Sequence, residues 1–178
     1  RVWTAQNGTY LMITDGTYGY YITGTTLSRI TDADFPTPSS LTFQDGYFIV
    51  TQDDSDSFFI SGANDPTSWD ATDYTSAEGN PDNATSIISD HRELFVFGDK
   101  TIEIYYNSGD STFPFERIAG AFIERGMGAS LSVAKADNSV FWLADDWTVR
   151  RIIGYQPAIV STRQIEYQFS KYSVKSDA

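Results

Sequence analysis

The stretch SSLTFQDGYFIVTQDDSDSFFIS, residues 39–61, decides the fold because its pattern returns twice later in the chain. It predicts a strand, a polar turn, an apolar strand, a second polar turn and a third strand, since β-branched and aromatic runs alternate with turn-forming residues. Its two counterparts are TSIISDHRELFVFGDKTIEIYYN at 85–107 and SLSVAKADNSVFWLADDWTVRRI at 130–152. The central strands of the three copies are predicted at 47–50, 94–97 and 140–143.

The copies recur at nearly constant spacing. Phe48, Phe95 and Phe141 are aligned in the central strands, 47 and 46 residues apart, and a weaker copy at 7–23 places Leu11 37 residues before Phe48. A period of 40 to 50 residues with several strands per unit is typical of β-propeller blades. A β-sandwich has similar local strand spacing but does not require this recurrence.

We therefore predict an all-β fold, a β-propeller or partial propeller of about three to four blades. Residues 1–178 form a single domain in this interpretation. Closed rings usually have four to eight blades, and the chain begins with Arg1 rather than Met, so we expect further blades outside this sequence. The expected blade units are 1–38, 39–84, 85–129 and 130–160.

A short helix is predicted near the C-terminus, at about 162–172. Ser161 followed by Gln164 matches a capping box. Ile165, Phe169 and Tyr172 would then share one helical face, although a period of two also fits this segment.

The composition provides a large core and an acidic surface. Four Trp, 11 Tyr and 12 Phe supply apolar volume, and the net charge is −12. Residues 1–90 carry 13 acidic and 2 basic side chains, so this half repels phosphate and should not wrap nucleic acid tightly or read its sequence. No apolar run approaches the roughly 18 residues of a membrane helix, and no signal peptide precedes the first copy.

Catalytic, metal and cofactor sites are not predicted. His91 is the one histidine and sits in an expected polar turn, and the absence of Cys removes thiolate chemistry. Asp53, Asp54 and Asp56 could offer oxygen ligands to calcium, but they lack the EF-hand pattern and a solvated hairpin turn is the simpler interpretation. Abundant carboxylates leave a glycosidase as a weak alternative, without any copy of the sialidase Asp box.

One long segment, SGANDPTSWDATDYTSAEGNPDNATS at 61–86, shows neither helical nor strand periodicity. Structureless loops beyond about 12 to 15 residues usually have a function or are disordered. We expect residues 62–83 to form an excursion between blades, packed through Trp69 and Tyr74, that either meets a partner or covers a blade edge. In the partner hypothesis, Trp69→Ala weakens assembly more than it weakens folding. The candidate interface residues are Trp69, Asp70, Tyr74 and Pro81.

The order of segments in residues 40–178 resembles the packaged DNA stabilisation proteins of short-tailed bacteriophages, the P22 tail hub family. The resemblance depends mainly on FFI leading into YTSAEGNPD, on FGDKTIEIYYNSG at 97–109, and on the stretch at 119–129. It implies a propeller that forms a homo-oligomeric ring in the virion. It also implies contacts with the portal adaptor and with the tail needle or distal tail, helping to retain the genome after synthesis in the host cytoplasm.

This resemblance gives the acidic residues a second hypothesis. If they faced the DNA passage, they would keep the duplex from adhering during ejection. The candidate acidic surface consists of Asp53, Asp54, Asp56, Asp65, Asp70 and Asp73.

A different class of function remains open from the sequence. A carbohydrate- or receptor-binding propeller could use the aromatic cluster Tyr18, Tyr20 and Tyr21, together with carboxylates on the loops. Packing of these tyrosines between blades would explain them equally well.

Overall fold

The computed structural model describes residues 2–77, 79 and 82–172, which contain sixteen β-strands and one α-helix. The strands form four antiparallel four-stranded sheets, each in sequence order, and we call these blades 1 to 4. Blade 1 contains β1 (Trp3–Gln6), β2 (Leu11–Thr14), β3 (Gly19–Thr23) and β4 (Thr26–Arg29). Blade 2 contains β5 (Pro38–Gln44), β6 (Tyr47–Gln52), β7 (Ser57–Gly62) and β8 (Asp65–Ser76). Blade 3 contains β9 (Ala84–Asp90), β10 (Glu93–Gly98), β11 (Ile102–Asn107) and β12 (Phe115–Ile123). Blade 4 contains β13 (Ala134–Ala136), β14 (Ser139–Leu143), β15 (Val149–Ile153) and β16 (Gln156–Ile159).

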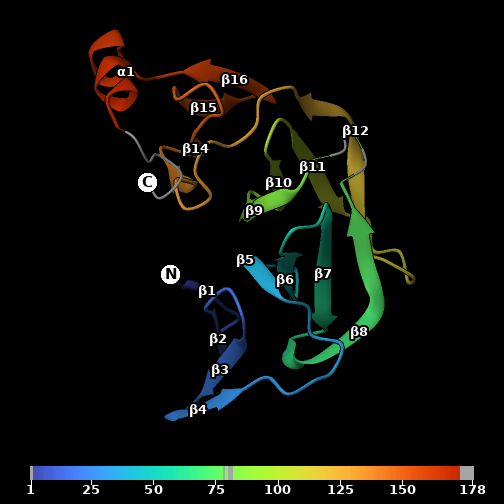
Figure 1. Cartoon of the computed structure of the whole chain (residues 1–178). Coiled ribbons are helices and arrows are strands. Elements are labelled where there is room, and N and C mark those ends of the chain that lie inside the picture. Colours follow the sequence, from blue (N-terminus) through green and yellow to red (C-terminus); the bar gives the residue numbers. More distant parts are fainter. Residues whose placement is uncertain (1, 78, 80–81, 173–178) are drawn as a thin grey trace.

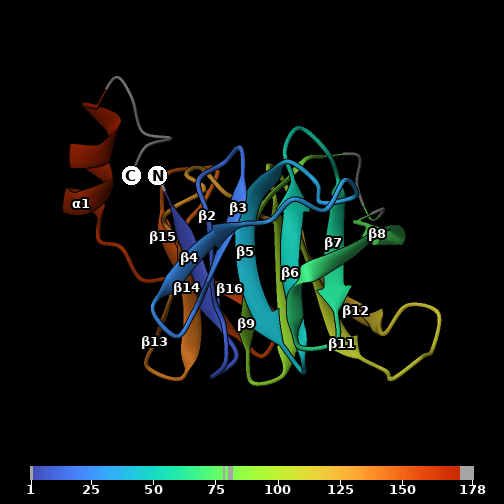
Figure 2. The same ribbon diagram turned by 90° about the horizontal axis from the view of Figure 1, so that it is seen from below.

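The blades stand side by side along an arc, with blade 1 and blade 4 at its two ends (Figure 1). The first strands β1, β5 and β9 contact one another on the inner side, and the fourth strands lie on the outer rim. Figure 2 shows the strands of all four blades running roughly along one common axis. The predicted all-β propeller architecture with a short C-terminal helix is therefore confirmed.

The expectation of a structureless segment at 61–86 is wrong. Twelve of its residues form β8, which pairs with β7 from Ser57↔Ser76 to Gly62↔Asp65. The register shifts twice along this pair, and such bulges break the period of two by which a strand is recognised in sequence. The three-strand repeat read from the sequence had likewise omitted the outer strand of each blade.

The alignment of Phe48 with Phe95 is also wrong by one residue. Phe48 packs toward blade 1 whereas Phe95 packs toward blade 4, and neighbouring residues on a strand face opposite sides. The residues that face the preceding blade are Phe48, Leu94 and Val140, at a constant spacing of 46.

The core consists of three apolar clusters, one at each junction between neighbouring blades. Met12 of blade 1 packs with Phe48 and Val50 of blade 2. Ile49 and Phe58 of blade 2 pack with Leu94 and Val96 of blade 3. Phe97 and Ile104 of blade 3 pack with Val140 and Trp142 of blade 4, and the rings of Phe97 and Trp142 are 5.7 Å apart. Each blade is thus stabilised by its neighbour.

Side chains of β5 in blade 2 also form hydrogen bonds with the backbone of blade 3. Ser40 and Thr42 of β5 accept from the backbone N–H groups of Ile87 and Ser89 on β9, both at 3.1 Å. The amide of Gln44 donates to the carbonyl of Arg92 at 2.8 Å. These bonds replace a strand ladder between sheets and fix the register of one blade on the next.

The helix α1 (Arg163–Ser170) forms within the predicted range, but its predicted capping box does not. Thr162 is the N-cap and makes no side-chain capping bond, while Ser161 donates to Glu166 at 2.8 Å and accepts from the N–H of Val149. No residue of α1 is buried, and the helix projects away from the blades in Figure 2. Among the described residues, no helix has the length and apolarity required to cross a membrane.

The first hairpin turn of blade 3 provides a test of local strain. His91 and Arg92 have φ angles of 49° and 65°, and Arg92 occupies the place held by Gly46 in blade 2. Because glycine removes the left-handed strain, Arg92→Gly should raise the free energy of unfolding by about 1 kcal/mol in urea titrations. Arg92→Ala removes the same exposed ion pair with Asp45 but keeps a Cβ, so it should bring no gain. Equal behaviour of the two variants would contradict this explanation.

Candidate functional site

Trp69, the first predicted interface residue, is a core residue on β8. Its side chain is 6% exposed, its ring meets Phe35 edge-on at 5.0 Å, and its indole N–H donates to the carbonyl of Pro66. Its backbone N–H donates to a carboxylate oxygen of Asp32. The predicted packing of Trp69 against the blades is confirmed. Because the side chain is part of the core, we expect its loss to weaken folding itself, and its effect on assembly stays a prediction.

Asp70 and Tyr74 lie beside Trp69 on the outer rim. The four residues 70–73 have no strand partners, because Trp69 pairs with Ser61 and Tyr74 pairs with Phe59. Asp70 accepts from the N–H and hydroxyl of Thr72, and this holds its pKa below the ordinary value. Tyr74 stacks on Phe59 at 5.2 Å but remains 47% exposed. Pro81 lies outside the described residues.

The six acidic candidates do not form one surface. Asp53 and Asp54 lie in the second hairpin turn of blade 2, and Asp56 lies just before β7. Asp65 begins β8 at the opposite end of the blade, and Asp70 and Asp73 follow along the rim. Burial and the nearby charge of Asp70 raise the pKa of Asp73. The structure therefore separates two acidic groups. We call Asp53, Asp54 and Asp56, which lie between β6 and β7, the axial group, and Asp65, Asp70 and Asp73, which lie on β8, the acidic rim.

The axial group is part of a repeated feature that the sequence analysis missed. The second hairpin turn of every blade contains an aspartate near its start, and three of these are spaced by 46 residues. That spacing was available in the sequence as a signal. The four residues are Asp15, Asp53, Asp99 and Asp145.

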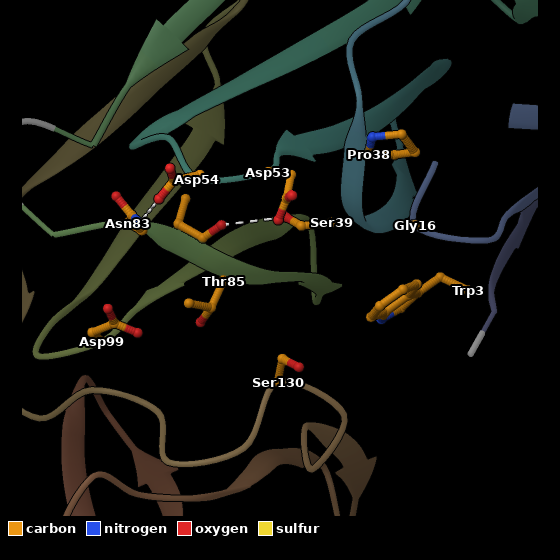
Figure 3. Close-up of a pocket in the computed structure, with 11 residues that line it drawn as sticks. Trp3, Gly16, Pro38, Ser39, Asp53, Asp54, Asn83, Thr85, Asp99 and Ser130 are labelled. Atoms are coloured by element: carbon orange, nitrogen blue, oxygen red, sulfur yellow. Dashed lines mark hydrogen bonds between the residues drawn. The ribbon is translucent and has the colours of Figure 1, made fainter. Parts of the chain in front are cut away.

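A cleft of about 370 Å³ opens among these turns (Figure 3). Asp53, Asp54 and Asp99 contribute carboxylates to its lining, and Thr85 and Ser130 contribute hydroxyl groups. Within the cleft, Asn83 donates to Asp54 at 2.9 Å and Ser39 donates to the carbonyl of Ala84 at 3.5 Å. These oxygen acceptors suit hydrogen-bond donors and positive groups, and they repel phosphate.

The aspartates of these turns have different electrostatic environments. Asp15 accepts from the N–H groups of Tyr18 and Thr17, which lowers its pKa. Partial loss of water around Asp99, together with the charge of Asp82, raises the pKa of Asp99. Asp145 is paired with Arg125 at 3.0 Å. The cleft beside Asp53 and Asp99 consequently keeps more negative charge than the turn of blade 4.

A buried carboxylate in blade 3 was also missed. Glu103 on β11 is 1% exposed and accepts from the N–H of Gly79 at 2.6 Å, from Tyr105 and from Arg117. Gly79 lies on the segment that leads from β8 to β9, so Glu103 ties this crossing to blade 3. A glutamate between apolar strand residues carries no distinctive sequence signal, because its partners come from distant positions.

The tyrosine cluster of the sugar-binding alternative is divided by the fold. Tyr21 packs into the junction of blades 1 and 2, where it meets Tyr10 edge-on. The guanidinium of Arg29 covers the ring of Tyr18 at 3.6 Å, and Tyr20 bonds to Asp15. The three rings therefore do not form one flat stacking platform. His91 does lie in a turn, where it bonds to Asp90.

From residue types alone, the sequence analysis predicted no metal site. The structure shows in addition how the acidic and histidine side chains lie relative to one another. Within residues 2–77, 79 and 82–172, no three acidic or histidine side chains come together in a group that could hold a metal ion.

The repeated four-stranded sheets, the 46-residue period and the first strands on the inner side of the arc define a β-propeller protein. Residues 1–177 match the family described as Bacteriophage P22 Gp10, beta-propeller, and the chain belongs to that family of phage structural proteins. The suspected resemblance to the P22 tail hub family is thereby confirmed.

Solved structures with the same architecture are only distantly similar in sequence. Apo AztD from Citrobacter koseri is 14% identical, with a TM-score of 0.53 over 88% of this chain and 45% of that chain. Hsv2p from Kluyveromyces lactis is 8% identical, with a TM-score of 0.53 over 97% of this chain and 52% of that chain. The chain thus spans about half the length of these propellers, and the likeness concerns the fold alone. A search of curated protein sequences found no match.

Trp69→Ala should destabilise the isolated chain strongly. Loss of a buried tryptophan costs about 3–5 kcal/mol of unfolding free energy, which urea titration followed by circular dichroism will measure. Tyr74→Ala, a change at the exposed neighbour, should cost about 1 kcal/mol or less. Similar losses for both would show that Trp69 is not the core residue described above.

Asp99→Asn and Asp15→Asn should have opposite effects on stability. A raised pKa means that ionisation of Asp99 opposes folding, a penalty that grows as the pH rises above 3.8, so Asp99→Asn should increase the melting temperature at pH 7. A lowered pKa means that ionised Asp15 favours folding above pH 3.8, so Asp15→Asn should decrease it. Both differences should shrink as the pH falls through this range in calorimetric scans. Shifts of the same sign would refute the two assignments.

Proposed function

We propose that the chain is a structural component of a phage tail, non-enzymatic, which joins the portal-adaptor region to the distal tail and helps to retain packaged DNA. Membership of the P22 Gp10 propeller family over residues 1–177 is the observation that carries this proposal. It acts in the virion, in a homo-oligomeric ring and in contact with the portal adaptor and with the tail needle or distal tail. The whole protein's partners belong to the proposal, because the chain spans about half the length of the solved propellers.

The outer rim of blade 2 is the surface that we assign to a partner. Tyr74 exposes an aromatic ring held in place by Phe59, and rigid aromatic side chains are common at the centres of protein interfaces. Asp70 adds a negative charge beside it, within a strand segment whose backbone is unpaired by β7. A partner with an apolar pocket and a basic margin would complement this rim.

The acidic axial end supports a role as a conduit rather than a DNA clamp. Asp53, Asp54 and Asp99 share one cleft, and their charge raises the electrostatic free energy of a nearby phosphate backbone. Retention of DNA then depends on protein contacts that close the tail. Sequence-specific binding of nucleic acid is not part of this proposal.

The test is assembly with the portal-adaptor protein of the same phage, measured by light scattering after chromatography. The chain should form a defined mixed complex, and Tyr74→Ala should weaken it about tenfold or more, as expected for an interface anchor. Tyr106→Ala is the matched control, since Tyr106, on β11 of blade 3, is a similarly exposed tyrosine outside this rim, 40% against 47%. Absence of a complex with the adaptor would contradict the proposal. Equal effects of the two substitutions would show that Tyr74 is not part of the interface.

A further inference from the structure

A pocket of about 620 Å³ lies on the concave side of the arc, and we call it the inner pocket. The first strands of all four blades line it, with Gln6 from β1, Phe43 from β5, Ile88 from β9 and Lys135 from β13. Its volume falls within the range of about 300–1,000 Å³ that is usual for ligand pockets. Because the contributing strands are far apart in the sequence, no local motif indicated this position.

The lining of the inner pocket is apolar but not closed. Trp3 and Phe43 pack at the edge of the core cluster between blades 1 and 2, and Ile88 and Val133 pack at the edge of the cluster between blades 3 and 4. All four are only partly buried, whereas the central residues of the same clusters are enclosed. They therefore retain apolar surface, and its burial by a bound group would be favourable.

The inner pocket carries one positive charge and no negative charge. Lys135 is the only ionisable side chain among the described residues that line it, although the net charge of the chain is −12. Its ammonium donates to the carbonyl of Ser89 at 3.0 Å and has two further N–H donors. In the described part of the chain, six other Lys and Arg side chains pair with carboxylates, and Lys135 forms no such pair. The pocket is thus suited to an anion, in contrast to the acidic cleft at the axial end.

We infer that the inner pocket binds a segment of a partner protein that presents an aromatic or aliphatic side chain beside a carboxylate. The apolar side chain would cover Phe43 and Ile88, and the carboxylate would accept from the ammonium of Lys135. Lysine suits this role because its compact charge lies on a flexible stem that can adjust to the anion. The apolar contact is necessary as well, since an exposed ion pair contributes little by itself.

The inference rests on the proposed function for the kind of partner, a protein of the phage tail. Nucleic acid is the less suitable occupant, because its repeated phosphates would meet a single ammonium within a strongly acidic chain. The site itself is testable without the adaptor.

The test uses the isolated chain, with N-acetyl-phenylalanine as the probe and amide chemical shifts in NMR as the measurement. We expect a dissociation constant of about 1–10 mM, with shifts centred on Gln6, Ile88 and Lys135. N-acetyl-phenylalanine amide keeps the ring but lacks the carboxylate, so it should bind about fivefold more weakly. N-acetyl-glycine keeps the carboxylate but lacks the ring, so it should also bind about fivefold more weakly or worse.

Four results would overturn the inference. Two of them are equal binding of N-acetyl-phenylalanine and its amide, and the absence of shifts at about 20 mM probe. The third is a set of shifts centred on Asp53 and Asp99, which would place binding in the axial cleft. The fourth is tighter binding of a thymidine dinucleotide, which would favour nucleic acid as the occupant.

Variants of Lys135 assign the effect to its charge. Lys135→Gln should weaken probe binding about fivefold, and Lys135→Arg should keep the affinity within about twofold. Lys135 is exposed, so both variants should fold. Lys100→Gln is the control, since Lys100 is an exposed lysine outside the inner pocket, and it should leave binding unchanged. Undiminished binding to Lys135→Gln, or an equal loss in Lys100→Gln, would contradict the assignment.

A second pair of variants tests the lining without removing the lysine. Thr4 is an exposed residue of β1 that lines the inner pocket, and Thr4→Glu should weaken probe binding by placing a carboxylate there. Thr4→Gln, of similar shape but neutral, should not. Equal binding to these two variants would count against the site. Failure of the adaptor complex while the probe still binds would count against the proposed function alone.

Discussion

The packing of one sheet face on the next is the interaction on which this molecule depends. Each four-stranded sheet is too small to bury both of its faces, so its apolar residues require a neighbouring blade. Phe48, Leu94 and Val140 occupy the same position in three successive blades, and none is more than 1% exposed. These contacts hold the first strands on the inside of the arc and set where the turns of each blade point. The functional surfaces follow from that placement.

The constant spacing of 46 residues converts a sequence repeat into a spatial one. Equivalent residues of blades 2, 3 and 4 come to the same end of the molecule, and for this reason Asp53 and Asp99 share a cleft although 46 residues separate them. The same relation makes the differences between blades informative. Arg92 and Asn138 hold the same turn position, and so do Asp45 and His91, so the turn residues that form an ion pair between blades 2 and 3 are replaced by an amide and an imidazole between blades 3 and 4.

Buried polar groups connect the blades where apolar packing does not reach. Glu103 is fully enclosed but accepts from three groups, including the backbone of Gly79 on the crossing to blade 3. A buried carboxylate is tolerated only with such partners, since an unpaired one would cost several kcal/mol. Ser40 and Thr42 similarly bond β9 across the junction. These bonds fix how the rim and the axial turns lie relative to the core.

The sequence by itself determined the propeller, because a repeated alternation of apolar strands and polar turns requires stacked sheets. It also placed His91 and Asp53 in turns, since turn chemistry is local. It did not reveal β8, whose bulges disrupt the period of two, and it misaligned Phe48 with Phe95, because a one-residue error leaves composition unchanged but reverses the face. Only the tertiary structure buried Trp69 against Phe35, divided the acidic residues between an axial end and a rim, and joined Phe43, Ile88 and Lys135 around one pocket. Those outcomes depend on contacts between blades, which are distant in sequence and are decided by how neighbouring sheets pack.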